Sequence, residues 1–218
     1  MTIKLLPDVR TRCHTSHMLT KACLLGIVAI LLFSAAAPSP PQQAATDPAY
    51  TSDGQLKLPD NYRQWIYLST GFDMSYNPGM QMGHHVFDNV FVNPESYKAF
   101  LETGTWPDNT MLVLEVRAAE GKGSINQKGN YQSTDVMGLE VHLRDSRRFQ
   151  GGWAFFGFDD KKTASMVPRE AACYSCHSAH AAVDTTFVQF YPTLLPVAKS
   201  KGTLSADYLK ESSAAPAK

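Results

Sequence analysis

The sequence has no excess charge of either sign and few cysteines. Its 20 basic and 20 acidic side chains give a formal net charge of +0 over 218 residues, so nothing in the charge suggests nucleic-acid binding. The apolar run from Ala22 to Phe33 is shorter than the roughly 20 residues that a transmembrane helix needs. Of the four cysteines, Cys13 and Cys23 lie at or before the start of this run. The rest of the chain therefore keeps two cysteines, Cys173 and Cys176.

The N-terminal segment has the order of features found in a secretory signal peptide. Basic residues precede the apolar run, and the small residues of "SAAAPS" follow it. We therefore expect residues 1–37 to be a signal peptide, with an uncleaved membrane anchor as the alternative. Residues 38–53 are rich in Pro, Ala and Gln and are expected to form a flexible linker. Either way, the rest of the chain is predicted to be exported to the periplasm, and an uncleaved segment would tether it to the membrane.

The segment "CYSCH", from Cys173 to His177, matches the C-x-x-C-H signal for c-type haem attachment. In that chemistry both thiols bond covalently to the haem, and the histidine supplies an axial nitrogen to iron. A disulfide and a redox-active C-x-x-C are alternatives in an exported protein. Zinc would need about two more ligands at suitable spacing, and only His180 lies nearby. The position of His177 directly after the second cysteine favours haem attachment. We therefore expect one covalently attached haem c, with His177 as the iron ligand.

The pattern along the chain predicts an α+β fold, a mostly antiparallel sheet with flanking helices and the haem attached near the C-terminus. In residues 93–104, Asn93 is a good N-cap, Pro94 a good first helical residue and Gly104 a good stop. A second helix is expected after Pro168, carrying the haem motif to about residue 182. Strands are expected at 84–92, 110–118, 135–145 and 151–158.

The chain order differs from that of two common haem proteins. Small helical electron-transfer cytochromes carry C-x-x-C-H early and use a downstream Met, whereas here the last methionine, Met166, precedes His177. The four-helix cytochromes c′ have a late motif but few strands. His180 lies on nearly the same helix face as His177, so it cannot reach the other side of one haem. We therefore expect an open position on the iron opposite His177.

From about Gly54 to Lys199 the sequence resembles the cytochrome P460 family, which includes the β-sheet cytochromes c′ (cytochrome c′-β). The shared segments are "LPDNYRQW", "VFVNPESYKAFLETGTWPDNTMLVLE", "WAFFGF" and "ACYSCHSAHAAVDTTFVQFYP". The resemblance implies one c-type haem on an antiparallel sheet, usually in a homodimer, with the motif histidine as the only protein ligand. It implies a haem domain over residues 54–200, and we expect residues 201–218 to form a disordered tail.

The sequence departs from the family pattern at a position that matters for chemistry. Family enzymes that oxidise hydroxylamine carry a lysine cross-linked to the porphyrin edge, and the resemblance places Leu114 at that position. The family's distal arginine corresponds to Asp88. These differences favour the cytochrome c′-β branch. Leu114 and Phe87 are the candidate residues of the pocket around the haem.

Two functions from different classes follow from these observations. An open iron under apolar cover favours small, nearly neutral ligands. The first hypothesis is therefore a protein that senses, carries or removes nitric oxide or related nitrogen species. The second is a haem oxidoreductase that oxidises hydroxylamine and passes electrons to another cytochrome. Simple electron transfer is a third alternative, which an open coordination position disfavours. The sequence leaves enzymatic turnover undecided.

Overall fold

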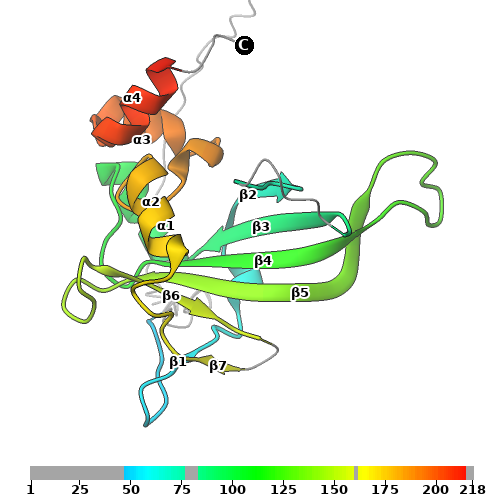
Figure 1. The fold of residues 1–218 in the computed structure, drawn as a ribbon, viewed down its shortest axis with the longest axis horizontal. Helices are drawn as coiled ribbons and strands as arrows, with labels where there is room; N and C mark the ends of the chain where they lie inside the picture. Colours follow the sequence, from blue (N-terminus) through cyan, green and yellow to red (C-terminus); the bar gives the residue numbers. More distant parts are fainter. Residues whose placement is uncertain (1–46, 77–82, 160–161, 215–218) are drawn as a thin grey trace, which may run out of the picture. The chain divides into compact units, whose positions relative to one another are not determined.

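The computed structural model describes residues 47–76, 83–159 and 162–214, which all fall within the unit Ala44–Lys218. Its main sheet is antiparallel, has five strands and follows the order β2-β3-β4-β5-β6 (Figure 1). The strands are β2 (Ile66–Phe72), β3 (Val86–Val92), β4 (Met111–Glu120), β5 (Tyr131–Arg144) and β6 (Trp153–Gly157). A small second sheet pairs β1 (Leu56–Lys57) with β7 (Thr163–Ala164).

The helices gather at one end of the main sheet, where α2 runs beside the ends of the strands (Figure 1). They are α1 (Pro94–Thr103), α2 (Ala172–His180), α3 (Leu195–Lys201) and α4 (Ala206–Ala214), with 3-10 turns η1 (Tyr62–Gln64) and η2 (Val188–Phe190). The prediction of an α+β fold with a mostly antiparallel sheet is confirmed. Among the described residues, no helix is both long and apolar enough to cross a bilayer. The predicted signal peptide and most of the predicted linker lie outside these residues.

Helix α1 begins and ends where its local sequence predicts. Asn93 is the N-cap residue and Pro94 is the first helical residue. The Asn93 side chain does not cap the helix; its Oδ1 instead accepts a hydrogen bond of 2.8 Å from the Met111 amide at the start of β4. Gly104 ends the helix with φ of 76°, a left-handed conformation that glycine adopts without strain. Asn93 therefore ties the helix to the sheet.

The two faces of the main sheet have different partners because successive strand residues point to opposite sides. Val113, Val141 and Phe156 face the core cluster shared with β1, β7 and η1. Leu112 instead belongs to the cluster formed with α1 and α3. The face on the helix side also holds Leu114, which pairs directly with Val90 on β3 and with Glu140 on β5. This face forms the floor of the candidate site.

Two expected boundaries differ from the structure. The predicted linker, residues 38–53, ends in a packed segment: the Tyr50 ring lies 3.7 Å below the Arg148 guanidinium, and Tyr50 forms a bridge with Leu56. The predicted disordered tail, residues 201–218, contains α4. Tyr208 packs against the helical core, and the Ser205 hydroxyl accepts from its amide at 3.2 Å, so one aromatic contact and one cap stabilise a helix in a polar sequence.

Candidate functional site

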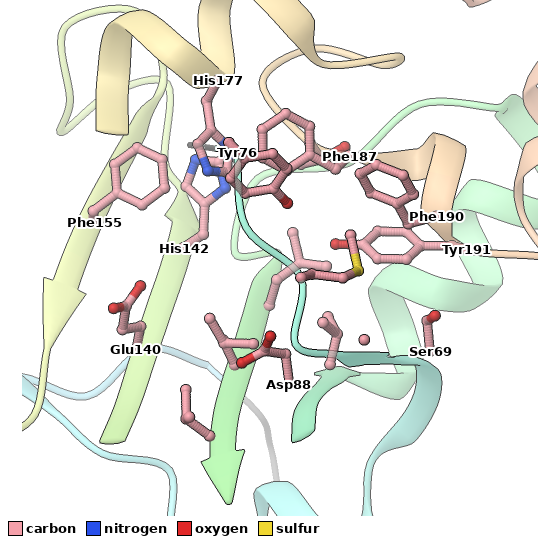
Figure 2. A pocket seen from close by; sticks show the side chains of 17 residues that line it. Ser69, Tyr76, Asp88, Glu140, His142, Phe155, His177, Phe187, Phe190 and Tyr191 are labelled. Atoms are coloured by element: carbon pink, nitrogen blue, oxygen red, sulfur yellow. The ribbon is translucent and has the colours of Figure 1, made fainter. Parts of the chain in front are cut away.

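A cavity of about 400 Å³ lies between the sheet, α2 and the segment that includes η2 (Figure 2). This volume lies within the range of about 300 to 1,000 Å³ that is usual for pockets that bind small molecules and cofactors. The sheet contributes seven side chains that form the floor: Ser69, Asp88, Val90, Leu112, Leu114, Val116 and Glu140. Met74, Tyr76, His142, Phe155, His177, Thr186, Phe187, Phe190 and Tyr191 form the walls, and Gly71 completes the lining.

Helix α2 carries the whole C-x-x-C-H motif. Cys173 is three residues before Cys176 and four before His177, and such spacings bring side chains to one face of a helix. Both thiols are free and half-buried. Tyr174 holds the helix against β6, because its hydroxyl accepts from the Phe155 amide at 3.3 Å and donates to the Val167 carbonyl at 3.0 Å. Helix α2 is thus fixed against β6, and its His177 lines the cavity.

His177 lines the cavity, and its ring is oriented by one hydrogen bond. Its Nδ1 lies 2.7 Å from the Thr185 carbonyl oxygen. A carbonyl can only accept, so Nδ1 carries the proton and Nε2 keeps a free lone pair. Burial lowers the pKa of His177, although its bond to the Thr185 carbonyl opposes this shift. A neutral imidazole with a free Nε2 is the form that binds a metal ion.

The loop that carries Thr185 is fixed by buried bonds from a distant part of the chain. The Trp106 indole donates to the Thr186 hydroxyl at 2.8 Å, and that hydroxyl donates to the Val183 carbonyl at 2.8 Å. Trp106 also packs on Phe100 of α1, with ring centroids 4.3 Å apart. The orientation of His177 therefore depends on the packing of α1 against this loop.

A second histidine lies beside His177, on the same side of the cavity (Figure 2). The rings of His142 and His177 meet edge to face with centroids 5.2 Å apart, and Phe155 stacks on His142 at 4.0 Å. Burial, with a smaller contribution from His177, lowers the pKa of His142 well below its usual value, so this ring is neutral. Its Nε2 lies 3.2 Å from the Thr185 hydroxyl. Both histidines therefore depend on Thr185.

The floor of the cavity is apolar in its centre and carboxylated beside it. Leu114, Val90 and Val116 form the centre, and the carboxyl groups of Asp88 and Glu140 also face the cavity (Figure 2). Burial raises the pKa of Asp88, and the charge of Asp73 adds to the shift. Glu140 is exposed as a residue, but partial loss of water around its carboxyl group over the cavity also raises its pKa, with contributions from Asp88 and Asp159. The apolar cover expected from the sequence is present at Leu114, and a carboxyl group lies on each side of it.

The two pocket residues predicted from the sequence lie on opposite faces of the sheet. Leu114 lines the cavity, but Phe87 is not among the residues that do. Its neighbour Asp88 points into the cavity, and alternation along β3 turns Phe87 to the other side, where its ring packs 4.9 Å from that of Phe72. His180 is exposed and pairs with Glu211 of α4 at 3.2 Å. Within the described residues, no group of three or more His, Cys, Asp or Glu is suited to a metal ion.

Comparison with known families gives a match to the model described as cytochrome P460 over residues 59–188, more than half of the chain. The chain belongs to the cytochrome P460 family. A comparison with curated proteins finds no match. Membership in this family supports a haem cytochrome, and the residues of the cavity fit that cofactor. His177, with an available Nε2, lines the cavity beside the apolar centre of its floor, and the two thiols on the same helix are free and half-buried.

Proposed function

We propose that this family member is an exported c-type cytochrome that binds nitric oxide or a related small nitrogen species. Cys173 and Cys176 would hold one haem covalently, and His177 would bind its iron. Haem iron with one histidine ligand supplies a free coordination position for a small ligand. The observation that carries the proposal is the bond from His177 Nδ1 to the Thr185 carbonyl, which leaves Nε2 free beside the apolar floor.

The side chains around the cavity support an open position opposite His177. His142 cannot take it, because axial ligands bind from opposite faces of a haem and the rings of His142 and His177 are in contact. Met74 is the one methionine among the described lining residues. Its sulfur packs against Gly71, where an added Cβ would lie only 2.6 Å from it. Met74 is therefore held against the edge strand β2, and β3 separates this strand from β4, which carries Leu114.

Leu114 favours ligand binding over hydroxylamine oxidation. The resemblance assigns its position to a lysine that bonds to the porphyrin edge, and a leucine has no nucleophilic atom. One observation favours the second function. Oxidation of hydroxylamine releases protons, and the carboxyl groups of Asp88 and Glu140 have raised pKa values, which suit a proton acceptor near neutral pH. Hydroxylamine oxidation with electron transfer to another cytochrome is therefore the alternative proposal.

The proposal includes the setting of the protein. The basic and apolar N-terminal segment supports export to the periplasm, with either cleavage or retention as a tether. The family resemblance supports a homodimer. A mature, secreted protein with covalent haem is therefore the form to examine.

Visible spectra of the reduced holoprotein, recorded with and without nitric oxide, test the proposal. We expect a five-coordinate c-type spectrum that changes on addition of nitric oxide. Met74→Ala should leave the starting spectrum unchanged, since its sulfur is not a ligand. A spectrum of a six-coordinate haem in the wild type, lost in Met74→Ala, would contradict the open position. Rapid reduction of an added cytochrome by hydroxylamine would instead favour the alternative.

A further inference from the structure

The charged side chains of the cavity are of one sign. Asp88 and Glu140 line it, and no lysine or arginine is among the described residues that do so. Its two histidines, His142 and His177, both have lowered pKa values and are neutral at ordinary pH. The interior of the candidate site therefore has a negative or neutral character, set by two carboxyl groups.

These two carboxyl groups lie on either side of the central floor residue. Leu114 on β4 pairs directly with Glu140 on β5, while Asp88 on β3 pairs with Val116, the next residue of β4 on the same face. A ligand above Leu114 thus has a carboxyl group on each flank. The charges of both carboxyl groups would act on this ligand across the cavity rather than through the packed core.

Neither carboxyl group has a hydrogen-bond or ion-pair partner among the described residues. Glu115 on the opposite face shows the contrast: Tyr62 donates to it at 2.5 Å, Arg63 pairs with it at 2.7 Å, and Arg117 also binds it. Because Arg117 is committed to Glu115 on that face, it does not neutralise the cavity. The negative charge of Asp88 and Glu140 is therefore available to act on a ligand.

We propose that Asp88 and Glu140 form a charge filter that weakens the binding of anions and favours neutral or cationic nitrogen species. This inference rests on the proposed function, since the ligands meet the filter at the haem. A negative ligand such as azide or fluoride would approach two like charges in surroundings poorer in water than bulk solvent, where Coulomb repulsion is stronger. Nitric oxide carries no charge and is not repelled, and a protonated amine such as hydroxylammonium is attracted.

Equilibrium titration of the oxidised holoprotein with azide and with fluoride, at about pH 8 and low salt, tests the filter. Both carboxyl groups have a raised pKa, so a pH this far above the ordinary carboxyl range is chosen to favour their ionised form. Asp88→Asn should tighten anion binding about fivefold, Glu140→Gln should tighten it less because Glu140 is more exposed, and the double variant should tighten it most. The gain should shrink as salt is added, because ions screen the repulsion. Nitric oxide binding to the reduced protein should stay within about twofold in all variants.

Two controls separate charge from other effects. Asp135→Asn removes the same charge from β5 at an exposed position outside the cavity lining, so it should leave anion binding unchanged. Glu140→Leu removes the charge without adding an amide that could donate a hydrogen bond to the anion, and it should tighten binding as Glu140→Gln does. Unchanged azide and fluoride affinities in the double variant, with normal nitric oxide binding, would refute the filter while leaving the proposed function intact. Failure of nitric oxide to bind the wild type would refute the proposed function itself.

Discussion

A substitution at position 114 tests how the floor of the cavity controls cross-linking of the haem. Leu114→Lys restores the residue type that the family resemblance assigns to the porphyrin cross-link. In the structure this position pairs directly with Glu140, and Cβ atoms of directly paired residues are about 4.5 to 5.5 Å apart. The introduced amine would therefore lie within reach of a carboxylate. From the sequence alone, burial without a partner would be expected to lower its pKa.

The cross-strand partner changes the expected reactivity of the amine. A lysine has an ordinary pKa of about 10.4, so only about one amine in a thousand is free at a pH near 7.4. Burial lowers the pKa of the introduced amine and increases the free fraction, whereas the Glu140 carboxylate raises the pKa and reduces that fraction. Each pKa unit changes the free fraction about tenfold. The cross-link replaces a porphyrin C–H bond by a C–N bond, so it needs a two-electron oxidant such as added peroxide. With so little free amine it should form slowly, and only a minority of molecules should carry it after a fixed time. Loss of half-buried leucine surface costs about 1 kcal/mol, and a cross-strand ion pair restores about 0.5 kcal/mol of it.

Removal of Glu140 should release this restraint. We expect Leu114→Lys to show little cross-linked haem, and the double variant with Glu140→Gln to show several times more. Mass analysis of the haem-bearing peptide measures this directly, since a cross-link joins the 111–120 strand to the peptide of Cys173–His177. Leu114→Met is the control for altered packing without an amine. Complete cross-linking in the single variant would refute the reasoning, because the carboxylate would then have no restraining effect.

Local signals in the sequence were sufficient for several elements. Pro94 and Gly104 fixed the bounds of α1 because first-turn prolines and left-handed stops act within one helical turn; Asn93 holds the N-cap position, but its side chain binds β4 instead. The strong strand composition of residues 110–118 likewise identified β4, whose observed bounds are Met111–Glu120. The motif from Cys173 to His177 was readable for the same reason, since its spacing alone places its side chains on one helix face.

Contacts between distant segments were not readable. Glu140 was missed because only the register of β4 with β5 places it opposite Leu114, and one residue of slip would have turned it to the other face. Thr185 was missed because its carbonyl, rather than its side chain, orients His177. Strand β5 begins at Tyr131 instead of residue 135, because pairing of Tyr131 with Glu120 extends the hairpin beyond the segment of strong strand composition.

Two further predictions concern covalent attachment and stability. Replacing both Cys173 and Cys176 by Ala should release the haem into acidified organic solvent, while the wild-type haem stays with the chain; haem retained by the double variant would contradict thioether attachment. Glu115→Gln should lower the free energy of unfolding by about 3 kcal/mol, because it removes a buried carboxylate between Arg63 and Arg117. Burial raises the pKa of Glu115, but hydrogen bonds from Arg117, Tyr62 and Arg63 together outweigh it, and the net pKa is lowered. A lowered folded-state pKa means that this stabilisation is present above the unfolded-state pKa, near 4.3, and is lost as the pH falls through the folded-state value. In urea unfolding, the difference in unfolding free energy between wild type and Glu115→Gln should therefore be largest near neutral pH and shrink toward acid. The visible spectrum should stay unchanged, since Glu115 faces away from the cavity. Glu120→Gln, at the exposed end of the same strand, should change stability by less than about 0.5 kcal/mol. If the difference in unfolding free energy did not change with pH, the interaction of Arg63 and Arg117 with the ionised Glu115 carboxylate would not be the source of the stabilisation.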